Sequence, residues 1–71
     1  MIVTDDAKVG DFLFERRTAL GMTQRQIAEA AHYNHVYVSR IETGMMVPRL
    51  DTLIALLHVL GLEIEIREKQ S

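Results

Sequence analysis

Residues 23–44, with the sequence TQRQIAEAAHYNHVYVSRIETG, hold the side chains whose types and spacing best suit molecular recognition. The segment predicts one helix, a tight break and a second short helix capped by Asn34. At the helical period, Val38 and Ile41 would point inward while Arg40 and its polar neighbours would point outward. A short helix with hydrogen-bonding groups on its outer face can read base edges in the major groove of DNA. The chemistry that this segment predicts is therefore base recognition.

Other chemistries find little support in the chain. No nucleophile stands beside a base at a catalytic spacing, and there is no glycine-rich phosphate loop. The histidines His32, His35 and His58 lack a nearby carboxylate or thiolate cluster, and the absence of cysteine excludes disulfides and thiolate metal sites. We therefore expect no catalytic residue, no metal and no cofactor, so that the protein is not an enzyme.

Helices must position the recognition residues. A first helix would begin after a polar cap within residues 4–6 and would end at Gly21, because glycine is the usual residue just past a helix. Thr23 would open the second helix, with Gln26 three residues later completing a capping box. A break over residues 31–34 would separate the second helix from the third.

The third helix is expected from His35 to about Thr43, with Gly44 ending it, and the fourth from about Leu50 to Leu60. Hydrophobic periodicity then predicts which residues face the core. The expected inward residues are Val9, Leu13 and Leu20 in the first helix, Ile27, Ala30 and Ala31 in the second, Val38 and Ile41 in the third, and Leu50, Leu53, Leu57 and Leu60, widened by Ile54 and Leu56, in the fourth.

The sequence period changes from helix to strand over residues 62–67, where apolar and charged residues alternate. A lone strand in a helical chain exposes unpaired backbone groups, so we expect it to pair antiparallel with the same strand of a second copy. The apolar connector after Gly44 would either pack in the core or, as we favour, add to this dimer contact. The expected dimerisation residues are Met45, Met46, Leu62, Ile64 and Ile66.

Size and charge limit the function further. The 71 residues predict a single domain over residues 1–71, and the net charge of −2 argues against a non-specific nucleic-acid binder. The acids gather at the two ends, whereas the middle of the chain is mildly basic through arginines alone. The N-terminus lacks the pattern of a secretion signal, and the apolar run over residues 53–62 is far below the ~20 residues that cross a bilayer, so we expect a cytoplasmic protein without membrane contact.

A set of residues at fixed spacing resembles the Cro/phage-repressor class of helix-turn-helix regulators, often called the Xre family. They are Gln24, Ile27-Ala28, Ser39-Arg40-Ile41-Glu42, Gly44, Pro48 and Leu50-Asp51-Thr52-Leu53. The resemblance covers roughly residues 9–61 and implies an all-α, compact four- to five-helix fold of the lambda-repressor type. The ending LGLEIEIR is similar to the HipB-type antitoxins, whose C-terminal strand joins two subunits and which bind both operator DNA and a kinase toxin.

The chain departs from the family at the turn, where His32 replaces the usual glycine. That position often needs a left-handed backbone, which histidine tolerates less well than glycine. We therefore expect the turn to be slightly strained or slightly reshaped.

The resemblance also implies roles for individual residues. Gln24 would hydrogen-bond a DNA phosphate, while His35, Val36 and Arg40 would read base edges. Tyr37, Ser39 and Thr43 would bind phosphates, and Arg49 would reach the backbone or the minor groove; an ordinary solvated surface is the alternative for each. Arg17 and Glu42 would form a buried structural ion pair. The candidate DNA-binding residues are Gln24, Arg25, His35, Val36, Tyr37, Ser39, Arg40, Thr43 and Arg49.

The expected function is sequence-specific DNA binding by a homodimer on a palindromic operator, with repression of its own promoter. The chain would act either as a regulator alone or as the antitoxin of a toxin–antitoxin operon with a kinase-type toxin as partner. The alternative from another class is a protein–protein interaction adaptor that uses the same helices without binding DNA, which the acidic net charge favours.

Overall fold

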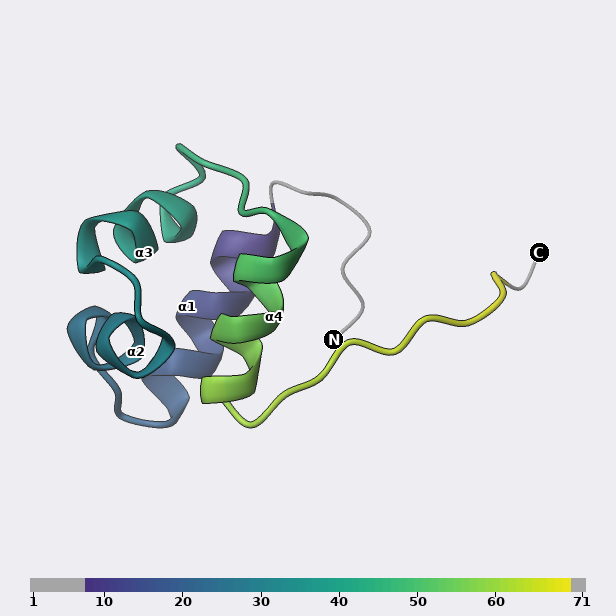
Figure 1. The fold of residues 1–71 in the computed structure, drawn as a ribbon, viewed down its shortest axis with the longest axis horizontal. Helices are drawn as coiled ribbons and strands as arrows, with labels where there is room; N and C mark the ends of the chain where they lie inside the picture. Colours follow the sequence, from purple (N-terminus) through teal and green to yellow (C-terminus); the bar gives the residue numbers. More distant parts are fainter. Residues whose placement is uncertain (1–7, 70–71) are drawn as a thin grey trace.

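The computed structural model describes residues 8–69 and contains four α-helices in that range. These are α1 (Val9–Ala19), α2 (Gln24–Ala31), α3 (His35–Glu42) and α4 (Leu50–Val59). Figure 1 shows α2 and α3 packed at one side of α1 and α4, with the residues after α4 leading away from the helices. The predicted all-α fold is confirmed. The cap predicted within residues 4–6 lies outside the described residues, and α1 begins after Lys8, which makes no side-chain cap.

The two helices within residues 23–44, α2 and α3, begin as the sequence predicts. At the start of α2, the Gln26 N–H donates to the Thr23 hydroxyl at 3.0 Å, and the Thr23 N–H donates to the Gln26 side-chain oxygen at 2.8 Å. At the start of α3, the Asn34 side-chain oxygen accepts from the Val36 N–H at 2.7 Å. These bonds satisfy amide groups that have no acceptor within their own helix.

All four helices are followed by a residue in the left-handed conformation: Gly21, His32, Gly44 and Gly61. His32 has φ 64° and ψ 40°, and it is the only non-glycine residue with a positive φ in the described part of the chain. At the next residue, the Tyr33 N–H donates to the Ala28 carbonyl at 2.8 Å, as at the end of a helix that is terminated by glycine. The turn therefore keeps its regular form, and the predicted strain falls on the histidine backbone.

The core lies where the four helices meet. Its fully buried apolar residues are Leu13, Ile27, Ala28, Val38, Ile41, Leu56, Leu57 and Leu60.

The predicted inner face of α4 is partly wrong. Leu50 is 62% exposed and Ile54 is 50% exposed, whereas Thr52 and Leu56 are buried. Asp51 and His58, seven residues apart, mark the exposed side of α4, and Leu50 and Ile54 lie beside them on the helix surface rather than on the buried side. One side of α4 therefore covers the core, and another presents apolar side chains to solvent.

Two smaller expectations also differ. Ala28 rather than Ala30 faces the core from α2, and Leu20 is exposed at the end of α1. Gly10 is buried in α1, and a Cβ atom there would clash with the carbonyl oxygen of Ile41 and lie 2.9 Å from that of Glu42. The missing side chain thus lets α1 cross close to the end of α3.

The tail, residues 62–69, forms neither helix nor strand in the single chain. Leu62 packs against the core, while Ile66 is 91% exposed. A strand needs a hydrogen-bonding partner, so the pairing of residues 62–67 across a dimer stays a prediction. None of the helices described is both long and apolar enough to span a bilayer.

Replacing His32 by glycine should raise the free energy of unfolding by about 0.5–1 kcal/mol, because relief of the left-handed strain outweighs the added flexibility of the unfolded chain. Urea unfolding followed by circular dichroism measures the change. Gly21→Ala is the matched control, because an added Cβ meets nothing within 4 Å at φ 70°, and this variant should lose stability through strain alone. A His32→Gly variant no more stable than the parent would contradict the assignment of strain to this residue.

Candidate nucleic-acid interface

Helix α3 presents a mixed polar and apolar outer face. Val38 and Ile41 are almost completely buried and fix the rotation of the helix against the core. On the other side, Val36 is 44% exposed and Arg40 is exposed, while His35 is half-buried at the first turn. The three residues predicted to read bases thus all have accessible surface on one short helix.

The flank of α3 is ordered by an aromatic contact. The rings of Tyr33 and Tyr37 stack with their centroids 5.7 Å apart at an interplanar angle of 24°. Ser39 is half-buried, and the Thr43 hydroxyl at the end of the helix donates to the Arg40 carbonyl at 3.2 Å. Tyr33 lies in the turn, so the stack connects the turn to α3. The predicted site residues did not include Tyr33.

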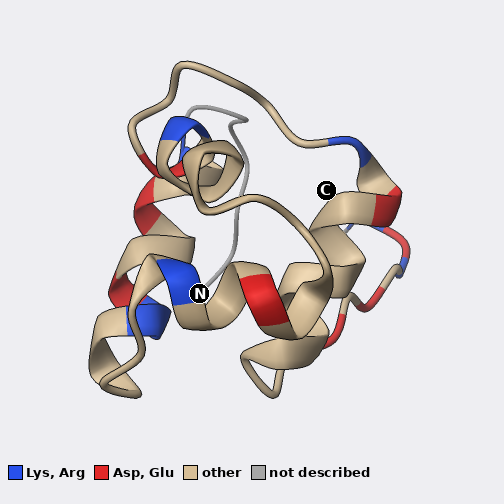
Figure 2. Cartoon of the chain, turned by 60° about the vertical axis from the view of Figure 1, so that its left-hand side comes forward, with Lys and Arg blue, Asp and Glu red and all other residues tan. Residues whose placement is uncertain are grey.

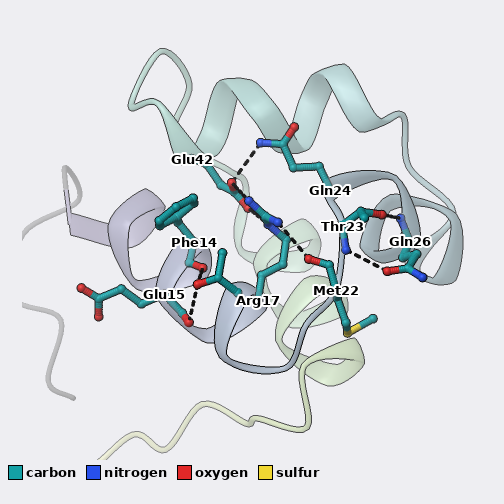
Figure 3. A network of polar contacts seen from close by, with 9 residues as sticks. Phe14, Glu15, Arg17, Met22, Thr23, Gln24, Gln26 and Glu42 are labelled. Carbon is teal, nitrogen blue, oxygen red and sulfur yellow. Dashed lines mark hydrogen bonds and ion pairs between the residues drawn. The ribbon is translucent and has the colours of Figure 1, made fainter.

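The buried Glu42 carboxylate joins α3 to two other helices (Figure 3). Its Oε2 accepts from Arg17 Nε at 2.7 Å, and its Oε1 accepts from Arg17 Nη2 at 2.9 Å. Oε1 also accepts from Gln24 Nε2 at 3.0 Å. The Arg17 Nη1 group donates to the Met22 carbonyl at 2.9 Å. The implied ion pair is therefore present, and it fixes α1, the start of α2 and the end of α3 relative to one another.

The surroundings of Arg17 stabilise its positive charge. The hydrogen bond to Glu42 raises the pKa of Arg17 above its usual value; burial opposes this rise and the attraction of the carboxylate charge reinforces it. The guanidinium carbon also lies 5.3 Å from the centre of the Phe14 ring, a cation–π distance. The Phe14 ring therefore lies against the guanidinium of the Arg17–Glu42 ion pair, a contact that the sequence patterns did not indicate.

The start of α2 offers hydrogen-bond donors. One N–H of the Gln24 side chain is held by Glu42, which orients the amide and leaves its second N–H for another acceptor. The backbone N–H groups of Gln24 and Arg25 are in the first turn, where a helix supplies no acceptor. This end of α2 can therefore donate to a phosphate oxygen.

Basic and acidic residues are interspersed over the helices (Figure 2). Within residues 8–69, neither Arg25 nor Arg40 forms an ion pair. Arg49 Nε lies 3.3 Å from Asp51 Oδ1, but both side chains are largely exposed, so the contact is weak and can exchange for another anion. Three arginines are thus accessible to a polyanion despite the negative net charge.

Four large apolar side chains are exposed in the connector and α4. They are Met45, Val47, Leu50 and Ile54, and Met45 is the most exposed at 78%. Met46, also predicted at the dimer contact, is half-buried. The prediction missed Leu50 and Ile54 because it placed them in the core. The polar pair Asp51 and His58, which lies beside them on the helix surface, was the signal that could have identified them.

A shallow groove runs between α4 and the tail, lined by Ile54, Leu57, His58, Leu62, Glu63 and Ile64. The predicted dimerisation residues Leu62 and Ile64 therefore lie beside α4, away from Met45 in the connector. No group of three or more histidine or acidic side chains in the described part of the chain could hold a metal ion.

The helix-turn-helix family model HTH_3 matches residues 13–67, which include all four helices except the first turn of α1. Among solved structures, the chain is similar to the clp gene regulator ClgR from C. glutamicum, with 29% sequence identity and a TM-score of 0.78. The similarity covers 83% of this chain and 76% of that one. No curated protein matches the chain significantly.

Removing the Glu42 carboxylate in Glu42→Ala should destabilise the fold by about 3–5 kcal/mol, because Arg17 would keep a half-buried charge without its partner. Chemical unfolding measures the loss. Glu29→Ala is the matched control, since Glu29 is exposed on α2 and forms no ion pair within residues 8–69, and it should change stability by less than about 0.5 kcal/mol. Equal losses in the two variants would show that the Glu42 network does not hold the helices together.

Proposed function

Because the chain belongs to the HTH_3 helix-turn-helix family, we propose that it is a sequence-specific DNA-binding regulator of transcription. The outer face of α3 carries the proposal. Val36 and Arg40 are accessible there, while Val38 and Ile41 anchor the opposite face. The similarity to ClgR, a gene regulator, supports the same function.

Base reading is assigned to three residues of α3. Arg40 can donate two hydrogen bonds to O6 and N7 of guanine, and its lack of an ion pair among the described residues leaves both donors accessible. Val36 can contact a thymine methyl group, which accounts for an apolar side chain on an otherwise polar face. His35, at the first turn, can bond either a base or a phosphate.

Phosphate contacts would position α3 in the groove. Gln24 and Arg25 contribute from the start of α2, where amide donors and the helix dipole favour an anion. Along α3 and beyond it, the other phosphate ligands that we propose are Tyr37, Ser39, Thr43 and Arg49.

We further propose that the protein works as a homodimer on a palindromic operator, with its two α3 helices about 34 Å apart, one turn of the duplex. The supporting observations are the exposed apolar side chains of the connector and α4 and the highly exposed Ile66 in the tail. Occlusion of its own promoter would then repress transcription of its own gene.

An antitoxin role is a finer form of the same proposal. Its support is the tail sequence LGLEIEIR, with its similarity to HipB-type antitoxins. Purification of the chain from its natural host tests the role: an antitoxin would carry a kinase-sized partner in stoichiometric amount, and a regulator alone would not.

Arg40→Ala should weaken binding to the operator about 10- to 100-fold and affect random DNA much less, because a bidentate contact to guanine discriminates between bases. The operator is first located by footprinting the DNA upstream of the chain's own gene, and affinities are measured by fluorescence anisotropy. Arg25→Ala is the matched arginine control. It should weaken both DNAs alike and reduce the salt slope by about 0.9, as expected for a phosphate contact.

Equal losses on operator and random DNA for Arg40→Ala would remove its base-reading role. A parent protein that shows no specific shift of its upstream DNA, even at low salt, would instead favour the protein–protein adaptor.

A further inference from the structure

Four of the five charges of the tail form a pattern that is complementary to itself. Glu63 and Glu65 are followed by Arg67 and Lys69 at two-residue spacing, so an extended chain places all four on one face. In the single chain, Arg67 Nη1 lies 3.9 Å from Glu65 Oε1, and both side chains are about three-quarters exposed. On an antiparallel partner strand the order is reversed, so the two acids of one strand can lie opposite the two bases of the other.

We propose that two copies of the tail pair as antiparallel strands with Ile66 directly opposite the partner's Ile66. This inference rests on the proposed dimer and adds its register. In that register Glu63 faces Lys69 and Glu65 faces Arg67, each twice across the two-fold axis. Directly opposed charges of unlike sign stabilise an antiparallel pair, and those of like sign destabilise it.

The neighbouring registers bring like charges together. Centring the pair on Ile64 would set Glu63 against Glu65 twice, and centring it on Glu65 would set that residue against its own copy. A register centred between two residues would place both isoleucines opposite charged residues. An in-register parallel pair would oppose every charged residue to itself. Only the register centred on Ile66 pairs these four charges with opposite charges, and it sets the fifth charge, Glu68, opposite the partner's Ile64.

The exposed end of the tail's apolar face, at Ile66, fits the same arrangement. This face starts at Leu62, which packs against the core, and continues with Ile64, which lines the groove beside Ile54 on α4. Ile66 is then the most exposed large apolar residue described, at 91%. In the proposed register it meets its own copy directly and the partner's Ile64 diagonally, so a second copy covers the side chain that this chain leaves in solvent.

Single-cysteine variants read the register directly, because the parent chain has no cysteine. In Ile66→Cys the two Cα atoms would lie about 4.5–5.5 Å apart, within disulfide range. In Ile64→Cys the two cysteines would be four residues apart along the pair, about 13 Å, which is too far. Under mild oxidation, Ile66→Cys should form a covalent dimer at least about tenfold faster than Ile64→Cys or Glu65→Cys, whose cysteines would lie beyond direct opposition.

Charge-reversal variants test the same register independently. Glu65→Arg should raise the dimer dissociation constant about tenfold at low salt, Arg67→Glu should do the same, and the combined swap should restore it. Centring on Ile64 would instead make Glu65→Arg strengthen the dimer, and centring on Glu65 would leave its affinity unchanged. Sedimentation equilibrium measures these constants, and circular dichroism checks that each variant keeps its helices.

The register, the pairing of the tails and the dimer itself can each be disproved separately. Faster cross-linking at position 64 or 65, or no rescue by the charge swap, would overturn the register. A stable parent dimer that no tail cysteine cross-links would overturn tail pairing while the homodimer stands. A parent chain that stays monomeric at concentrations that saturate its operator would remove the dimer itself.

Discussion

The orientation of α3 depends on one buried carboxylate. Glu42 accepts two hydrogen bonds from Arg17 and one from Gln24, so a single side chain at the end of α3 engages α1 and the start of α2. A buried charge is tolerated only when its hydrogen bonds are made, and those donors are available in one arrangement of the helices. Gly10 completes this arrangement, because its missing side chain lets the backbone of α1 approach the last carbonyls of α3.

The same contact links structure to the proposed recognition of DNA. Gln24 bonds Glu42 from the end of α2 that offers amide donors, so the proposed phosphate anchor and the reading helix are fixed to each other. Val38 and Ile41 then set the rotation of α3 about its axis. Polar contacts thus fix the position of the helix, and apolar contacts fix which face it presents.

The features that could be predicted from the sequence are those decided within a few residues. The capping box of Thr23 and Gln26, the Asn34 cap and the outward face of α3 all follow from neighbours one turn away. The missed features depend on distant partners. The orientation of α4 was misjudged because Leu50 and Ile54 are apolar residues on its exposed side, and the close crossing at Gly10 involves residues more than thirty positions away. Within residues 8–69 the tail forms no strand, so the pairing that its alternating pattern predicts stays a prediction.

The stacked ring pair at the turn has an optical consequence. The chain contains two tyrosines and no tryptophan, and both tyrosines belong to this stack. Intrinsic emission and the tyrosine bands of the near-ultraviolet spectrum therefore originate at one place, between the turn and the flank of α3. A duplex seated against Tyr37 would perturb that signal, while association through the distant tail would leave it unchanged. The protein therefore carries an unlabelled optical reporter beside the outer face of α3, where we propose that DNA binds.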